Sequence, residues 1–268
     1  MSKKLYVVFL FGIILVGLAA APFAVNANHA WGNYHWARSS NPLSLQIGDN
    51  VTATWDAHLS AAVADWDASS VLSLAVAPGQ ARGKCRPTSG RIEVCNDFYG
   101  NNGWLGIAQI WVSGDHITQA TTKVNDTYFS SAPYNTPDWR QFVMCQEVGH
   151  DFGLGHQDEA FDNPNLGSCM DYTNDPTRND GQGNNLHPDT HDFDQLMSIY
   201  THLDSSGGGG GCNPRSPNCT SGNNGLPGSD FDTPGEWGQL VRAEGRIAVY
   251  ERDFGNANRV VTFVIWAN

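Results

Sequence analysis

Short hydrophobic runs in the first half of the chain alternate with polar segments, and most of them have the length and β-branched content of strands. Strands are predicted at 43–47, 71–77, 91–95, 105–112 and 117–125. The segment Ser113-Gly114-Asp115 joins the last two runs, so they are expected to form a hairpin. A helical period also appears, and its i, i+3, i+4, i+7 spacing predicts an amphipathic helix. The residues that carry it are Leu59, Ala62, Val63 and Trp66.

A second predicted helix has a well-marked start and end. Thr136 is a favourable N-cap, Pro137 suits the first helical position, and Asp138 complements the positive end of the helix dipole. Gly153 predicts the end, because glycine readily adopts the left-handed conformation that follows many helices. The stripe expected to pack inward consists of Phe142, Cys145, Gly149 and Phe152.

A linker divides the chain into a body and a tail. Ser205-Ser206 and the run 207–211 have the Ser/Gly composition of a flexible linker. The predicted units are therefore a body at 28–204, a linker at 205–211 and a tail at 212–268. A last helix is predicted at 190–203, just before the linker. Its buried face is expected to consist of Phe193, Leu196, Met197, Tyr200 and Leu203.

The tail is predicted to be rich in β-structure. Strand-like runs lie at 237–241, 247–252 and 260–266, with a turn at Gly255-Asn256, which favours a small antiparallel sheet. The tail carries no cluster of His, Cys or carboxylate residues with recognisable spacing. We therefore expect a stabilising or docking appendage.

Composition and charge narrow the class of protein. The 268 residues are 40% hydrophobic and only 16% charged, with 29 glycines, which excludes a disordered chain, a coiled coil and a collagen-like repeat. The formal net charge of −12 repels phosphate backbones, so nucleic acid is not expected as a partner.

The amino-terminal segment has the pattern of a secretory signal. Lys3 and Lys4 precede an apolar, uncharged run at 5–21, and Val25-Asn26-Ala27 offers a small-residue cleavage site. We predict a signal peptide at 1–27, secretion of the mature chain, and no stable membrane association after cleavage. The alternative is an uncleaved anchor, which also places the rest of the chain outside the cell.

Export changes the interpretation of the six cysteines. An even number in an oxidising compartment indicates disulfides, although six cysteines allow 15 connectivities. Proximity in sequence favours two pairs and leaves a third. These are Cys85–Cys95, Cys212–Cys219 and the remaining Cys145 with Cys169.

The candidate chemistry lies at the end of the second predicted helix, in the stretch 146–156. Gln146 and His150 are one turn apart on the same face, so both side chains can reach one ion. Glu147 lies at the edge of that face, and His156 can return from the turn at Gly153 as a third ligand. Three protein ligands and a water molecule are the arrangement of a catalytic zinc site.

This stretch resembles the zinc signature of the metzincin clan of metalloproteases, H-E-x-x-H-x-x-G-x-x-H. Every fixed position matches except the first, where Gln146 replaces His. The clan's methionine turn is also present, as Ser168-Cys169-Met170-Asp171-Tyr172. The resemblance spans about residues 40–204 and is nearest the matrixin-like bacterial members. It implies an α+β fold with a twisted mixed sheet, a zinc helix, the Met turn and a closing helix, followed here by the small β-rich tail.

The resemblance also implies roles for individual residues. His150 and His156 would bind Zn²⁺, Glu147 would be the general base, and Met170 would form the floor beneath the metal. Tyr172, two residues after the methionine, would bind zinc or stabilise the tetrahedral intermediate. The zinc helix and Met turn lie side by side in this family, which implies a disulfide between the cysteines that precede Gln146 and Met170.

The family's substrate binds in an extended conformation along an edge strand, and 105–112 would be that strand. The implied activity is therefore a secreted zinc metalloendopeptidase acting on a protein or peptide substrate. The alternative is a catalytically inactive binding protein that keeps the fold and the cleft, because position 146 departs from the signature.

Gln146 leaves three interpretations open. Its amide oxygen binds zinc as an unusual ligand, or another histidine substitutes, for which His187 and His191 are the nearest candidates, or the site is degenerate. Calcium is a further candidate cofactor, because several carboxylates follow the motif and calcium takes oxygen ligands. They are Asp158, Glu159 and Asp162, and a solvated acidic loop is the alternative interpretation.

Overall fold

The computed structural model describes residues 29–81, 84–204 and 231–267, and a single mixed sheet dominates them. The strand order is β3-β2-β4-β6-β5-β9-β8-β7, and the short β1 pairs with β6 off this path. The strands are β1 (His35–Trp36), β2 (Leu43–Asn50), β3 (Leu72–Pro78), β4 (Ile92–Asp97), β5 (Trp104–Ser113), β6 (His116–Asn125), β7 (Gln239–Glu244), β8 (Ile247–Gly255) and β9 (Asn258–Trp266).

The sheet changes from parallel to antiparallel at one strand. The pairs β2–β3, β2–β4, β4–β6 and β1–β6 are parallel, whereas β5 runs antiparallel to β6, as predicted for the hairpin at 113–115. Beyond β5, the pairs β5–β9, β9–β8 and β8–β7 are all antiparallel. The predicted α+β class and the mixed sheet are confirmed.

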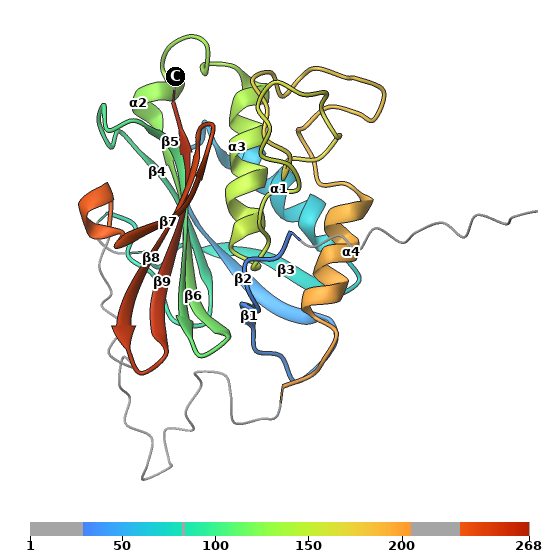
Figure 1. Ribbon diagram of the computed structural model, residues 1–268, viewed down its shortest axis with the longest axis vertical. Coiled ribbons are helices and arrows are strands. Elements are labelled where there is room, and N and C mark those ends of the chain that lie inside the picture. Colours follow the sequence, from blue (N-terminus) through green and yellow to red (C-terminus); the bar gives the residue numbers. More distant parts are fainter. Residues whose placement is uncertain (1–28, 82–83, 205–230, 268) are drawn as a thin grey trace, which may run out of the picture.

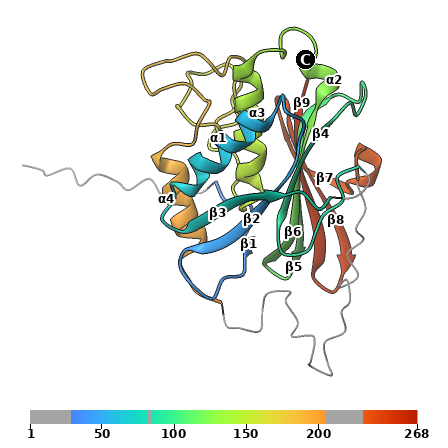
Figure 2. The ribbon, with the colours of Figure 1, turned by 180° about the vertical axis from the view of Figure 1, so that it is seen from behind.

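Helices α1, α3 and α4 lie on one face of the sheet, as Figures 1 and 2 show from opposite sides. The helical segments are α1 (Asp56–Asp67), α2 (Asp126–Phe129), α3 (Pro137–His150), α4 (Thr190–Ile199) and the 3₁₀ turn η1 (Pro234–Glu236). The four apolar residues predicted to face inward on α1 are all buried, which confirms that helix and its face.

Helix α3 begins and ends where the sequence predicts. The Thr136 side chain accepts a hydrogen bond from the Trp139 N–H, and Pro137 occupies the first turn. Gly153 adopts φ +93°, and a Cβ there would lie 2.1 Å from the Tyr34 carbonyl oxygen. Only glycine fits this position, both for its conformation and for the close approach of the amino-terminal segment.

Helix α4 is shorter than predicted. It ends at Ile199, and Tyr200 leaves the helical conformation while its hydroxyl donates to the Phe152 carbonyl at 3.0 Å. Leu196 and Tyr200 are buried as predicted, but Met197 is 42% and Leu203 56% exposed. The prediction was wrong for these two residues, because Leu203 lies beyond the helix and Met197 faces solvent.

The tail continues the main sheet rather than forming a sheet of its own. Its three predicted strands are present, and Gly255 and Asn256 both adopt positive φ in the predicted turn. However, β9 pairs with β5 along its whole length, from Ser113 opposite Asn258 to Trp104 opposite Trp266. The strands β7–β9 (red) accordingly lie beside β5 and β6 (green) in Figure 1.

The pairing of β9 corrects one expectation. Residues 105–112 lie between β6 and β9 and are therefore not an edge strand. Strand β9 is apolar on both faces, which suits a central strand. Val261, Phe263 and Ile265 join the core beneath the helices, while Val260 and Val264 join a second cluster around Trp104 on the opposite face.

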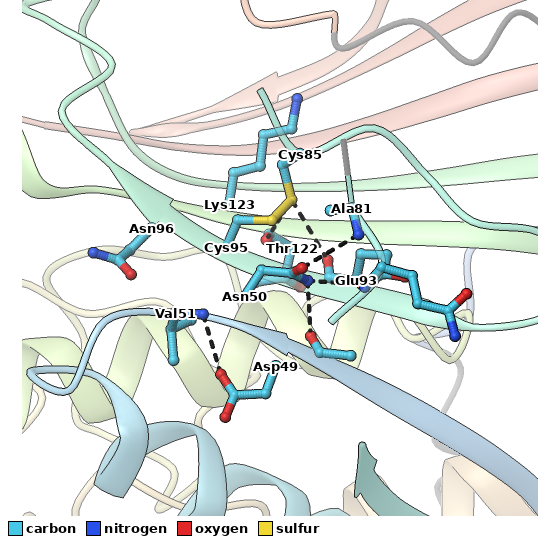
Figure 3. The surroundings of a disulfide bond; sticks show 12 residues. Asp49, Asn50, Val51, Ala81, Cys85, Glu93, Cys95, Asn96, Thr122 and Lys123 are labelled. Carbon is cyan, nitrogen blue, oxygen red and sulfur yellow. Dashed lines mark hydrogen bonds between the residues drawn. A yellow bond between two sulfur atoms is a disulfide. The ribbon is translucent and has the colours of Figure 1, made fainter. Parts of the chain in front are cut away.

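The disulfide Cys85–Cys95 is confirmed and ties the segment after β3 to β4 (Figure 3). Beside it, the Asn50 amide donates to Glu93 Oε2 at 2.7 Å and accepts from the Ala81 N–H at 3.2 Å. These contacts hold the same segment against the end of β2.

Several predicted features lie outside the described residues. These are the signal peptide at 1–27, the linker at 205–211 and the Cys212–Cys219 pair. Among the helices that the structure does describe, none has the length and apolar character needed to cross a membrane.

Candidate metal centre

Helix α3 and the turn after it bring two predicted ligands together. The imidazole rings of His150 and His156 approach with their Nε2 atoms 3.1 Å apart. A tetrahedral zinc ion with bonds of 2.0–2.1 Å separates its ligand atoms by about 3.3 Å. The spacing of the two nitrogens is therefore close to that of two ligands of one ion.

The outer nitrogens of both rings face acceptors. His150 Nδ1 lies 2.8 Å from the Leu154 carbonyl oxygen, and His156 Nδ1 lies 3.6 Å from Glu159 Oε1. A proton on Nδ1 leaves the lone pair on Nε2, which is how metal-binding histidines are oriented. Glu159 thus has a specific place beside His156, which the sequence interpretation did not foresee.

Burial keeps both histidines neutral. It lowers the pKa of His150 well below the ordinary value, and the charge of His156 acts in the same direction. Burial also lowers the pKa of His156 to about 3, with a further contribution from Arg242. Neutral imidazole is the form that binds metal, so no proton has to be removed from either ring at neutral pH.

The fully buried Gln146 has its amide fixed by the Met turn. Its Nε2 donates to the Cys169 carbonyl at 2.7 Å. Because a carbonyl only accepts, the amide nitrogen must face it, and Oε1 points the other way. Among the described residues, Oε1 has no hydrogen-bond partner and is buried. An unpaired buried amide oxygen is costly, so it is an acceptor in need of a hydrogen-bond donor or a cation.

Glu147 is also fully buried, and neither carboxylate oxygen has a hydrogen-bond partner within the described ranges. It lies against β5, where a Cβ on Gly106 would be only 2.6 Å from Glu147 Oε1. Burial raises the pKa of Glu147 well above its ordinary value, and the nearby Asp151 raises it further. A carboxyl in this environment is poised to hold a proton.

The Met turn packs directly on α3. Gly149 leaves room for Met170, since a Cβ there would lie 2.5 Å from the Met170 sulfur. Tyr172 is buried, and its ring centroid lies 6.3 Å from that of His156. Burial raises the pKa of Tyr172, so its hydroxyl stays protonated.

The disulfide between Cys145 and Cys169 is confirmed. It joins the residue before Gln146 to the residue before Met170, and both cysteines are fully buried. The Cys145 carbonyl also accepts a hydrogen bond from Trp66 Nε1 at 3.0 Å, which ties α1 to the same point. The bridge therefore fixes the carbonyl that orients Gln146.

We expect the double variant Cys145→Ala with Cys169→Ala to lose about 3.5 kcal/mol of unfolding free energy, because the bridge closes a loop with a sequence separation of 24. Denaturant unfolding measures the loss. The matched control is Cys85→Ala with Cys95→Ala, whose separation of 10 predicts about 2.7 kcal/mol. Only loss of the Cys145–Cys169 bridge should also weaken metal binding at the motif. Equal metal affinity in both double variants would contradict the role of this bridge in orienting Gln146.

The tail covers the site from two sides. The Phe263 ring on β9 stacks on the His150 ring, with centroids 4.3 Å apart and 5° between the planes. On the other side, Arg242 of β7 pairs with Glu159 at 2.8 Å. Sequence reasoning missed this cover, although the two-faced apolar pattern of 260–265 was a signal that β9 is a central strand.

The two alternative histidines lie elsewhere. His187 Nδ1 contacts Asp65 at 2.7 Å at the surface, and the His191 ring stacks on that of His29, with centroids 4.9 Å apart. In the described ranges, no hydrogen bond or ring contact joins either residue to His150 or His156. The structure therefore offers no support for them as the missing ligand.

Two of the carboxylates proposed for calcium accept hydrogen bonds within their own loop, and the third pairs with the tail. Asp158 accepts hydrogen bonds from the Ala160 N–H and the Asn163 amide, and Asp162 accepts from Asn174. Glu159 pairs with Arg242, as above. These contacts favour the acidic-loop interpretation, and calcium stays a sequence prediction.

Comparison with known proteins shows little similarity in sequence. No family model matches the chain, and no curated protein matches it. Among solved structures, it is similar to High choriolytic enzyme 1, a hatching enzyme zinc-protease from Oryzias latipes (medaka fish), with 11% identity and a TM-score of 0.35. The match covers 66% of this chain and 99% of that chain. A TM-score at this level establishes no common fold.

Proposed function

We propose that the chain is a secreted zinc metalloendopeptidase of the metzincin type. His150, His156 and Gln146 would hold the zinc, and Glu147 would act as the general base. The observation that carries the proposal is the 3.1 Å separation of the Nε2 atoms of His150 and His156. On the helix that carries His150, Gln146 and Glu147 present a buried amide oxygen and a buried carboxylate, for which the described residues offer no hydrogen-bond partner. Two disulfides among the described residues support an oxidising, extracellular location.

The proposed mechanism gives separate roles to the metal, Glu147 and Tyr172. When bound, zinc would act as a Lewis acid that polarises the substrate carbonyl and lowers the pKa of a water molecule to about 7. Glu147 would accept the proton of the attacking water and pass it to the leaving amine, which its raised pKa favours. The protonated hydroxyl of Tyr172 can donate a hydrogen bond to the developing oxyanion.

A second function is favoured by the position of the tail. Because β9 occupies the strand position next to β5 and Phe263 covers His150, an extended peptide cannot pair with β5 in this arrangement. An inactive binding protein would need no access to the metal. A peptidase that binds its substrate along β5 must release β9 before it turns over, so the two functions would then differ in whether that release occurs.

Metal analysis joined to a cleavage assay tests the proposal. The full secreted protein should hold an equivalent of zinc that His150→Ala removes, and it should cleave an unstructured protein until a chelator is added. If the protein binds zinc but does not cleave, even when β9 is released from β5, the result would favour the inactive binding protein. Failure of His150→Ala to change the metal content would overturn the zinc assignment.

Gln146→His tests the unusual ligand directly. Imidazole is a better zinc donor than an amide oxygen, so we expect the dissociation constant for zinc to fall by on the order of tenfold, about 1.4 kcal/mol. Hydrolysis should rise or be restored. Gln146→Ala is the matched control and should weaken binding. If both variants bind zinc as the wild type does, Gln146 is not a ligand.

A further inference from the structure

Three histidines and one aspartate from separate parts of the chain meet in one cluster beside β1. His35 lies in β1 and is the register partner of His116 at the start of β6. His202 and Asp204 follow α4. None of the four belongs to the motif at 146–156, and none was singled out by the sequence.

The three histidines converge on one carboxylate oxygen of Asp204. Asp204 Oδ1 lies 3.1 Å from His116 Nε2, 3.3 Å from His202 Nε2 and 3.5 Å from His35 Nε2. The ligand atoms of His35, His202 and Asp204 all lie within 4.8 Å of one another. The separations of Asp204 Oδ1 from His202 Nε2 and His35 Nε2 are close to the value of about 3.3 Å that separates ligand atoms in a tetrahedral zinc site, whereas His116 lies outside this group.

Hydrogen bonds orient the donors toward the shared point. His35 Nδ1 lies 2.6 Å from the Asn33 carbonyl oxygen, which places the proton on Nδ1 and the lone pair on Nε2. That Nε2 is buried and has no hydrogen-bond partner among the described residues, and His35 is only 6% exposed. An imidazole lone pair held in this way is aimed into the cluster and is unsatisfied there.

Arg38 holds the segment that carries His202 and Asp204 in place. Its backbone N–H donates to Asp204 Oδ2 at 2.8 Å, which leaves Oδ1 for the histidines. Its Nε donates to the His202 carbonyl at 3.2 Å, and the Asp204 N–H donates to the Arg38 carbonyl at 2.7 Å. The segment that carries His202 and Asp204 is thus fixed against the residues that follow β1.

The donor set selects the ion. Imidazole nitrogens favour zinc and its neighbours in the transition series, whereas calcium and magnesium take oxygen ligands. A cavity of about 390 Å³ opens beside His35 and His202, which gives an ion a route to the donors. His202 itself is half exposed, with 54% of its side chain accessible.

We propose that His35, His202 and Asp204 form a second zinc site, and that His116 positions Asp204 through the hydrogen bond between them. Because its ligands come from β1 and from the segment after α4, and His116 of β6 bonds to Asp204, the site has a structural role. It pins the segment after α4 to β1 and to the β5–β6 hairpin, at the point where the chain leaves the body for the tail.

Zinc stoichiometry of the full mature protein tests the proposal. After dialysis against a weak chelator, the wild type should hold one more equivalent of zinc than His202→Ala, whose affinity at this site should fall at least 100-fold. Asp204→Asn should lose the same equivalent. Zinc should raise the melting temperature of the wild type more than that of either variant.

His187→Ala is the matched control, because His187 is also 54% exposed and also contacts one aspartate. It should leave the zinc content unchanged. His150→Ala reports separately on the motif, so the two sites are distinguishable whichever of them fails. Equal zinc content in the wild type, His202→Ala and Asp204→Asn would overturn the second site and leave a hydrogen-bonded cluster in its place.

Discussion

Phe263→Ala should lower the free energy of unfolding by about 3–5 kcal/mol, the usual cost of deleting a fully buried aromatic ring. Phe263 is 1% exposed and stacks on His150, so the lost ring leaves a gap directly beside the motif. We therefore expect a second effect, a rise of at least tenfold in the rate at which a chelator removes zinc from the folded protein. Denaturant unfolding and zinc-release kinetics measure the two effects.

Val264→Ala is the control for Phe263→Ala. Val264 is the next residue on β9 and is also fully buried, but it faces the cluster around Trp104 on the opposite side of the sheet. It should loosen the strand without opening the space beside His150. Phe263→Leu, which keeps most of the volume, should have intermediate effects. If the two alanine variants release zinc at the same rate, Phe263 does not cover the metal.

The parts of the fold that sequence could predict depend on local chemistry. The limits of α3 follow from the cap at Thr136 and the positive φ at Gly153, which are decided within a few residues of each end. The β5–β6 hairpin follows from a short turn between two β-rich runs. The inward face of α1 follows from its period alone.

The parts that sequence could not predict depend on contacts between distant segments. The pairing of β9 with β5 joins residues more than a hundred positions apart, and no local signal specifies the partner of a strand. The exposure of Met197 follows from where α4 lies on the body, which its period does not fix.

Some features of the candidate site could likewise be predicted from the sequence, and others depend on contacts between distant segments. The spacing of Gln146, His150 and His156 predicts that they can share an ion, because helix geometry places the first two on one face and the turn at Gly153 lets His156 return to it. The hydrogen bond that turns the Gln146 oxygen away from Cys169 is tertiary, as is the stacking of Phe263 on His150. The cluster around Asp204 has no motif at all, since its members are spread from residue 35 to residue 204.

Glu147→Gln should abolish hydrolysis while leaving the zinc content unchanged. The amide has nearly the same shape as the carboxyl but cannot accept the proton of the attacking water, and loss of a general base typically costs 10²–10⁴-fold in rate. Zinc should remain because Glu147 is not assigned as a ligand. The fold should tolerate the change, because burial raises the pKa of Glu147 and so favours the neutral carboxyl, which the amide resembles.

The sign of the stability change follows from that raised pKa. A carboxyl whose folded-state pKa is raised contributes most stability below its unfolded value, and the contribution is lost as the pH rises toward the folded value. The metal-free wild type should therefore lose stability on this rise, and Glu147→Gln should lose less, because the buried Asp151, whose pKa is also raised, remains. Asp151→Asn is the control, because Asp151 is also buried and directly follows α3, but its carboxylate accepts a hydrogen bond from the Thr122 hydroxyl at 2.8 Å. Cleavage that survives Glu147→Gln, or that Asp151→Asn removes equally, would contradict Glu147 as the base.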